Sequence, residues 1–150
     1  MALLRDGRRC VGVEISELRL EPETDRCVYR TTLLRADGGE EMAVVLSVEG
    51  NREPIGELRG LCDDLGQAAA GELRAMHFET LEEGFALEVE QEGDGLFRIT
   101  FWLDLTRLDP ATRLLALKGE PQVGLRLLAG PADLGRFWSE LAEDLGRMYS

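Results

Sequence analysis

The chain has 150 residues, and 17 Lys and Arg stand against 29 Asp and Glu, so the formal net charge at pH 7 is −12. A nucleic-acid-binding protein needs a basic surface to displace counterions from phosphates, and an anionic membrane needs the same, so neither class of partner is expected. Hydrophobic residues make up 44% of the chain, which is enough to build a core. We therefore expect one folded domain over residues 1–150.

The cysteines and the first residues of the chain indicate the cellular compartment in which the protein is expected. The first residues hold no apolar stretch long enough for a signal peptide, and no run approaches the roughly 20 apolar residues of a membrane span. Cys10, Cys27 and Cys62 are widely spaced, which fits neither a disulfide framework nor a Cys-x-x-Cys metal site. We expect buried thiols in a cytoplasmic protein. The preference for arginine over lysine, with Lys118 alone, favours a bacterial source.

The first part of the chain predicts strands. Residues 11–15 alternate between apolar and small or polar side chains, and the phase then slips to Leu18 and Leu20. This slip predicts a bulge near Ser16 and Glu17. Residues 27–35 are rich in β-branched and aromatic side chains, and an alternation follows at Met42, Val44, Leu46 and Val48. The paired glycines within residues 36–40 favour a hairpin between these two runs, and therefore an antiparallel meander.

A mid-chain helix is predicted next. Pro54 suits the first helical turn, and Gly71 suits the end of the helix. Three further glycines at positions 56, 60 and 66 weaken the helix by up to ~1 kcal/mol each relative to alanine, so packing must stabilise it. An apolar stripe at three- and four-residue steps provides that packing: Ile55, Leu58, Leu61, Cys62 and Leu65.

A second group of strands follows, over residues 73–81, 85–90 and 97–105. The turn at residues 92–95 predicts a hairpin that pairs Val89 with Ile99, Leu87 with Phe101 and Phe85 with Leu103. This register keeps the large apolar side chains on one face, and it sets Glu90 opposite Arg98.

The C-terminal part predicts one more strand and a clear helix. Residues 109–118 favour a short helix, with a strand as the alternative, and residues 123–127 alternate as a strand. Pro131 opens the last helix, with Asp133 in its first turn. Its broad apolar face comprises Leu134, Phe137, Trp138, Leu141, Ala142, Leu145, Met148 and Tyr149. The expected fold class is α+β: a mainly antiparallel sheet of about six to seven strands, on which the mid-chain helix and the C-terminal amphipathic helix pack.

No residue pattern identifies a reaction. His77 is the only histidine, and no local serine, cysteine or carboxylate arrangement makes it a general base. Nucleophile-elbow, phosphate-loop and dinucleotide-binding motifs are absent, so we expect no catalytic residue and no cofactor. A single histidine excludes a histidine-rich metal site. Asp63, Asp64 and Asp94 could take part in a carboxylate site, but they lack EF-hand spacing, and no metal is expected.

The negative charge is concentrated in one stretch. No basic side chain lies between Arg74 and Arg98, and the predicted hairpin projects alternate carboxylates from one face. Such a row can be a solvated face that maintains solubility, or a surface for a cationic protein. The candidate partner-binding residues are Glu79, Glu82, Glu83, Glu88, Glu90, Glu92 and Asp94.

The order of elements at the end of the chain carries a family resemblance. An aromatic-rich strand, Phe97-Arg98-Ile99-Thr100-Phe101-Trp102-Leu103-Asp104-Leu105, precedes the strand Val123-Gly124-Leu125-Arg126-Leu127-Leu128 and the helix containing Phe137-Trp138-Ser139-Glu140-Leu141. This ending resembles the WapI-type immunity proteins of bacterial toxin systems. The resemblance implies a non-enzymatic cytoplasmic protein that binds and blocks a toxin. Many such toxins are nucleases with basic grooves, which an acidic surface would fit.

Three functional hypotheses follow. The leading one is a non-enzymatic acidic binding protein of the immunity or inhibitor type, which neutralises a protein partner with a basic surface, such as a toxin. The second is a ligand-binding or scaffold domain of a bacterial assembly, with its ligand near Trp102 and His77. The third is a carboxylate-based hydrolase assisted by a divalent metal.

Overall fold

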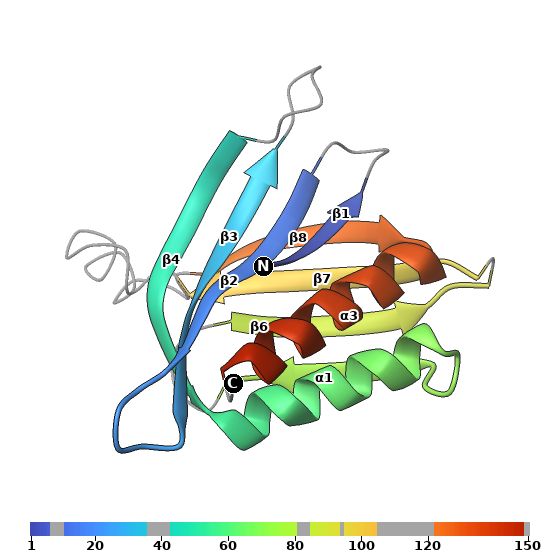
Figure 1. Ribbon diagram of the computed structural model, residues 1–150. Coiled ribbons are helices and arrows are strands. Elements are labelled where there is room, and N and C mark those ends of the chain that lie inside the picture. Colours follow the sequence, from blue (N-terminus) through green and yellow to red (C-terminus); the bar gives the residue numbers. More distant parts are fainter. Residues whose placement is uncertain (7–10, 36–42, 81–84, 94, 105–121, 149–150) are drawn as a thin grey trace.

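The computed structural model describes residues 1–6, 11–35, 43–80, 85–93, 95–104 and 122–148. The strands form two antiparallel sheets of four strands, each in sequence order (Figure 1). Sheet A comprises β1 (Ala2–Asp6), β2 (Val11–Leu20), β3 (Arg26–Arg35) and β4 (Ala43–Pro54). Sheet B comprises β5 (Ala75–Glu79), β6 (Phe85–Gln91), β7 (Phe97–Asp104) and β8 (Gln122–Ala129). The helices are α1 (Ile55–Ala69), which links the sheets, and α3 (Pro131–Arg147).

The expected α+β class, with antiparallel strands, a mid-chain helix and a C-terminal helix, is confirmed. The strands divide between two sheets of four, where we expected about six to seven strands in all. The strand that the sequence did not indicate is β1 (Ala2–Asp6). The predicted hairpin at residues 36–40 and the helix-or-strand alternative at residues 109–118 lie outside the described residues.

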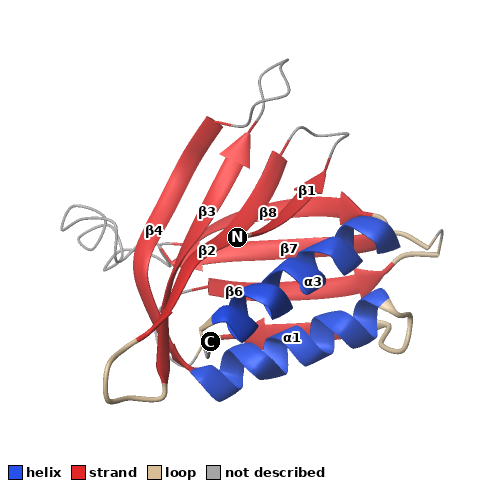
Figure 2. Ribbon diagram, in the orientation of Figure 1, coloured by secondary structure: helices blue, strands red, loops and turns tan. Residues whose placement is uncertain are grey.

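The helices lie together on one side of sheet B. Figure 2 shows α1 and α3 side by side across that sheet, while the strands of sheet A run steeply across the direction of sheet B. Helix α3 packs against α1 and β1, and β1 in turn adjoins β8. Edge strands of the two sheets therefore meet beneath the C-terminal helix.

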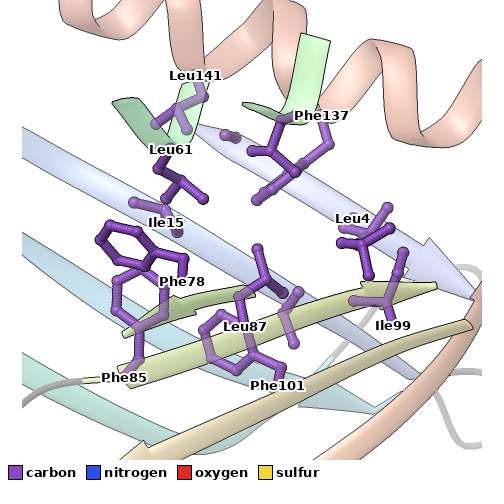
Figure 3. Close-up of a cluster of buried hydrophobic side chains, with 14 of the residues drawn as sticks. Leu4, Ile15, Leu61, Phe78, Phe85, Leu87, Ile99, Phe101, Phe137 and Leu141 are labelled. Carbon is purple, nitrogen blue, oxygen red and sulfur yellow. The ribbon is translucent and has the colours of Figure 1, made fainter. Parts of the chain in front are cut away.

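One contiguous core joins both sheets and both helices (Figure 3). Phe85 stacks on Phe101, with 5.2 Å between ring centroids, and meets Tyr29 of sheet A edge-on at 5.9 Å. Burial of such side chains supplies the main driving force for folding. The largest fully buried side chains are Tyr29, Phe101, Phe137, Leu4, Ile15, Leu58, Leu61, Leu65, Leu87, Ile99, Leu103 and Leu127.

At the edges where the two sheets meet, carboxylates accept hydrogen bonds from backbone N–H groups. The backbone N–H of Leu128 in β8 donates to Asp6 Oδ2 at 2.9 Å, and Asp6 is only 1% exposed. The backbone N–H of Leu3 in β1 donates to Glu140 Oε2 of α3, also at 2.9 Å. Unpaired amides on an edge strand invite pairing with another chain. These side chains instead tie β1 to α3 and β8.

Two bulges flank Arg30 in sheet A. The bulge predicted near Ser16 and Glu17 is confirmed, because the β2–β3 register shifts after Ser16 and Glu17 has φ +57°. A second bulge sets Glu49 and Gly50 of β4 opposite Arg30, with Gly50 at φ +74°. Arg30 forms ion pairs with Glu17, at 3.2 Å, and with Glu49. Bulges increase the local bend of a strand, and here the guanidinium group bridges both of them.

The simple alternation expected over residues 42–48 is wrong at Val44. Val48 is 1% exposed, as predicted for a core position, but Val44 is 63% exposed. The cause is a register shift, in which Leu33 pairs with Leu46 while Leu34 pairs with Val44. One inserted residue moves the earlier part of the strand to the opposite face.

The predicted β6–β7 hairpin is confirmed residue for residue. Val89 pairs with Ile99, and Glu90 pairs with Arg98. Gly95 in the connecting turn has φ +75°, which glycine adopts without the steric cost of a side chain. The other predicted pairs are Leu87 with Phe101 and Phe85 with Leu103.

Both helices begin and end close to the predicted positions. Pro131 opens α3 as expected, whereas Pro54 is the residue before the first turn of α1 and not part of it. Where the helices meet, Trp138 of α3 lies against Gly66 of α1. A Cβ atom at Gly66 would come 2.8 Å from Trp138 Nε1. Gly66 therefore allows the close approach of the indole ring.

The glycines of α1 give a stability prediction. Gly66→Ala is expected to lower the free energy of unfolding by ~1–2 kcal/mol, because Trp138 must move, which outweighs the better helix propensity of alanine. Gly60→Ala is the matched control, since nothing lies within 4 Å of its Cβ position. That variant should gain ~1 kcal/mol. Urea denaturation measures both, and an equal gain in the two variants would contradict the role of Gly66.

The thiols are buried, as expected, at Cys27 and Cys62, and both are free. Cys27 Sγ lies 3.5 Å from Met148 Sδ, and Cys62 Sγ lies 4.0 Å from the Trp138 carbonyl oxygen. Cys10 lies outside the described residues. Cys27 therefore packs between β3 and the end of α3, and Cys62 packs between the two helices.

Candidate functional site

The outer face of sheet B is turned away from the buried cluster. Alternate residues of β5 to β8 point to the core, and the intervening ones are half-buried or exposed. The paired strands bring the latter together on one surface. We call this surface the outer face: Ala75, His77, Glu79, Ala86, Glu88, Glu90, Arg98, Thr100, Trp102, Gly124, Arg126 and Leu128.

The structure brings part of the predicted acidic row together on this face. Glu79 is in β5, Glu88 and Glu90 are in β6, and Glu92 directly follows β6. We call these residues the acidic strip. Their side chains range from 35% exposed at Glu92 to 72% at Glu79. The remaining predicted members, Glu82, Glu83 and Asp94, lie outside the described residues.

The acidic strip is neutralised at one end. Arg98 of β7 forms ion pairs with Glu92 and, at 3.8 Å, with Glu90. Exposed pairs of this kind contribute little to stability, in the range of ~0–1 kcal/mol. Their effect is on the field of the surface, because a guanidinium group offsets the charge of Glu90 and Glu92.

The other end of the acidic strip surrounds the only histidine of the chain. His77 Nδ1 lies 3.2 Å from Glu88 Oε1, and Nε2 lies 3.6 Å from Glu79 Oε2. His77 is 53% exposed, so it is neither a core residue nor a buried base. Within the described ranges, neither Glu79 nor Glu88 has an arginine at ion-pair distance. Among the described residues, the two carboxylates beside His77 are therefore the members of the strip that no arginine offsets.

An aromatic side chain lies next to this end of the strip. Trp102 pairs with Ala86 of β6 on one side and with Gly124 of β8 on the other. A Cβ atom at Gly124 would be 3.0 Å from both Cδ1 and Nε1 of Trp102. The indole therefore lies against the backbone of β8, and its position depends on the absence of a side chain at residue 124.

The alternation in the sequence correctly predicted that Glu88 and Glu90 face outward together, but it did not connect Trp102 with Gly124. The sequence does carry one signal for the position of Trp102. Side chains alternate between the two faces of β7, so Trp102 must face outward when Phe101 and Leu103 face the core. Gly124 has the same parity in β8, but its pairing with Trp102 needs the β7–β8 register, which spans a long connection.

Of the hollows on the described surface, one of about 210 Å³ is lined by Glu92 together with Arg74, Gln91 and Gly93. Two others lie away from the acidic strip. One of about 510 Å³ lies between β2 and the end of α3, where Leu18, Leu20 and Met148 form part of its lining. Another, of about 320 Å³, lies beside Arg30 and Gly50 at the sheet A bulges. Neither is lined by His77 or Trp102. The ligand pocket that the second hypothesis places near those residues is therefore not one of these hollows.

Metal-binding clusters and membrane-spanning helices are both absent from the described residues. Over these ranges, no three or more histidine, cysteine, aspartate or glutamate side chains gather closely enough to hold a metal ion. No helix in the same part of the chain combines the length and the apolar character that crossing a membrane requires.

The chain was also compared with known proteins. Comparison with models of protein families, with the sequences of curated proteins and with solved protein structures finds no match.

Proposed function

We propose that this chain is a non-enzymatic binding protein of the immunity or inhibitor type, which binds a basic surface of a protein partner through the acidic strip. The observation that carries the proposal is the gathering of Glu79, Glu88, Glu90 and Glu92 at one side of the outer face. The formal net charge of −12 and the resemblance in element order to WapI-type immunity proteins support it.

The physical basis is electrostatic complementarity. Like charges on adjacent strands repel each other, so the acidic strip lowers the stability of the free protein. A cationic partner removes that repulsion when it binds. Complementary fields also accelerate encounter and select among partners, mainly through the association rate. Glu79 and Glu88 should contribute most, because Arg98 already offsets Glu90 and Glu92.

The experiment uses the products of genes adjacent to the gene for this chain. We expect one of them to be a basic protein that arrests growth when expressed alone, and to form a salt-sensitive complex with this chain. The Glu79→Lys/Glu88→Lys variant should slow association by about tenfold or more, with a smaller change in dissociation. Surface plasmon resonance measures both rates.

The matched control reverses two exposed carboxylates elsewhere. Asp63→Lys/Glu72→Lys changes the net charge equally, but at positions on and after α1. If both double variants slow association to the same extent, the effect belongs to net charge, and the acidic strip is not the binding surface. If no product of a neighbouring gene binds the wild-type chain, the immunity function itself is contradicted.

A further inference from the structure

On the outer face, Trp102 lies between two small residues, Gly124 and Ala86, and the carboxylates of the acidic strip begin beyond Ala86. The indole lies over Gly124, on the side of β7 away from Ala86. Along this row of the described strands, the methyl group of Ala86 is the only side chain between Trp102 and Glu79, so the described part of the outer face is low there. Among the described residues, none covers the indole from this side, so an incoming group can approach it there.

Two carboxylates adjoin the same low area. Glu79 pairs directly with Ala86 across β5 and β6, and Glu88 follows Ala86 by two residues on the same face. His77 lies between these carboxylates, within 3.6 Å of each. Directly paired residues are ~5 Å apart at their Cβ atoms, and residues two apart on one strand are ~7 Å apart, which a glutamate side chain can span. Both carboxylates can therefore reach a group placed over Ala86.

We propose that the area over Ala86 is a subsite for the guanidinium group of an arginine on the protein partner. This inference rests on the proposed function and names the chemistry that the partner presents. The guanidinium plane stacks against the indole of Trp102, while its N–H groups donate to the carboxylates of Glu79 and Glu88. The complementarity is one of charge and of shape, since a planar cation matches an aromatic wall beside two acceptors.

Arginine fits this arrangement better than lysine. A guanidinium group offers a rigid fork of donors, stacks on aromatic rings and is weakly hydrated. An ammonium group is a strongly hydrated point charge, which the acidic strip attracts but the indole does not orient. The subsite is therefore expected to distinguish the two cations, whereas the charge of the strip alone would not.

The test titrates the ¹⁵N-labelled wild-type chain with hexa-arginine and hexa-lysine peptides. The chain has two tryptophans, so two indole N–H signals are expected, and Trp138→Phe assigns them. Hexa-arginine should shift the Trp102 signal and leave that of Trp138 in place. It should bind about threefold or more tightly than hexa-lysine at the same ionic strength.

Three variants locate the effect. Trp102→Ala should weaken hexa-arginine binding by about tenfold and bring it to the level of hexa-lysine. Gly124→Ala keeps the indole but displaces it from its position against β8, and this variant should therefore reduce the preference for arginine. Asp63→Asn, an exposed position on α1, removes one charge away from the site and should preserve that preference. Circular dichroism verifies that each variant is folded.

The outcomes separate this inference from the proposed function. Equal affinity of the two peptides, with the Trp102 signal unmoved, would overturn the arginine subsite but leave the acidic binding surface standing. No binding of hexa-arginine to the wild-type chain would also overturn the subsite, and the proposed function is then judged by the neighbouring-gene experiment alone. A preference for arginine that Trp102→Ala abolishes supports the subsite.

Discussion

Asn51→Ala is expected to lower the free energy of unfolding by ~2–4 kcal/mol, although residue 51 is polar and far from the acidic strip. Asn51 is fully buried beside the β4 bulge. Its Nδ2 donates to the Val48 carbonyl oxygen at 3.1 Å and to Thr31 Oγ1 at 3.2 Å, with the Tyr29 carbonyl oxygen at 3.4 Å. The variant leaves these buried acceptors without their donor, and an unsatisfied buried group costs ~1–3 kcal/mol. Part of this cost is offset, because the variant also removes Asn51 Oδ1, which is buried without a partner among the described residues.

Two further variants separate the lost donor from the lost volume. Asn51→Asp keeps the shape but turns carboxylate oxygens toward buried acceptors, so it should destabilise at least as much as alanine at pH 7. Thr31→Val removes one acceptor and keeps the volume, and should cost only ~1 kcal/mol. Guanidinium denaturation measures all three variants. An Asn51→Asp protein as stable as wild type would show that the amide donor is not required.

Two other bulges of sheet A show the limit of prediction from sequence. The bulge at Ser16 was predictable because the apolar phase slips within β2 itself. The bulge before Leu46 was not predictable, because apolar residues continue on both sides of the extra residue. Only the pairing with β3 reveals that the register shifts there. Val44 was consequently assigned to the wrong face. A single-strand pattern reports local geometry, but a bulge is a property of a pair of strands.

The division of the strands into two sheets depends on contacts between residues that are distant in sequence. The β6–β7 hairpin was predictable in full because a short turn, an alternation and the Glu90–Arg98 pair all agree. Strand β1 (Ala2–Asp6) was missed because it is short and lacks β-branched residues. Its place depends on Asp6 and Glu140, which bond to backbone amides distant in sequence. No local spacing carries that information.

The candidate site also has one part that a single strand predicts and another part that depends on contacts between strands. The facing of Glu88 and Glu90 follows from the alternation of β6 alone. The neutralising ion pair between Arg98 and Glu92, the position of His77 between Glu79 and Glu88, and the seat of Trp102 on Gly124 each require side-chain placement across strands. The concentration of charge was thus predictable from the sequence, but which of these carboxylates an arginine offsets was not.

We expect the two buried thiols to make the free energy of unfolding decrease as the pH rises from 9 to 11. Burial raises the pKa of the Cys27 thiol from its ordinary value of 9.0 to about 11, opposed in part by a hydrogen bond with the backbone of Arg19. Burial, aided by the charge of Asp63, raises the pKa of the Cys62 thiol to about 11 as well. Between pH 9 and pH 11, the unfolded chain therefore binds fewer protons at these thiols than the folded one.

The sign and size of the effect follow from proton linkage. Below the unfolded pKa, both states hold the protons and the stabilisation is fully present; it is lost as the pH rises through the folded pKa. Each thiol should cost on the order of 2–3 kcal/mol over the whole interval, because one pKa unit corresponds to about 1.4 kcal/mol. Urea denaturation at pH 8 to 11, in a Cys10→Ser background, measures the loss.

The control is a Cys27→Ala/Cys62→Ala variant in the same background. It should be less stable at pH 8, because each substitution removes buried sulfur from the core. It should nevertheless show a shallower decline above pH 9, since ionisation of tyrosine and of Lys118 is common to both proteins. Parallel declines in the two proteins would contradict the assignment. The same burial predicts that neither described thiol reacts with an alkylating reagent at pH 8 until the chain unfolds, because only the thiolate is nucleophilic.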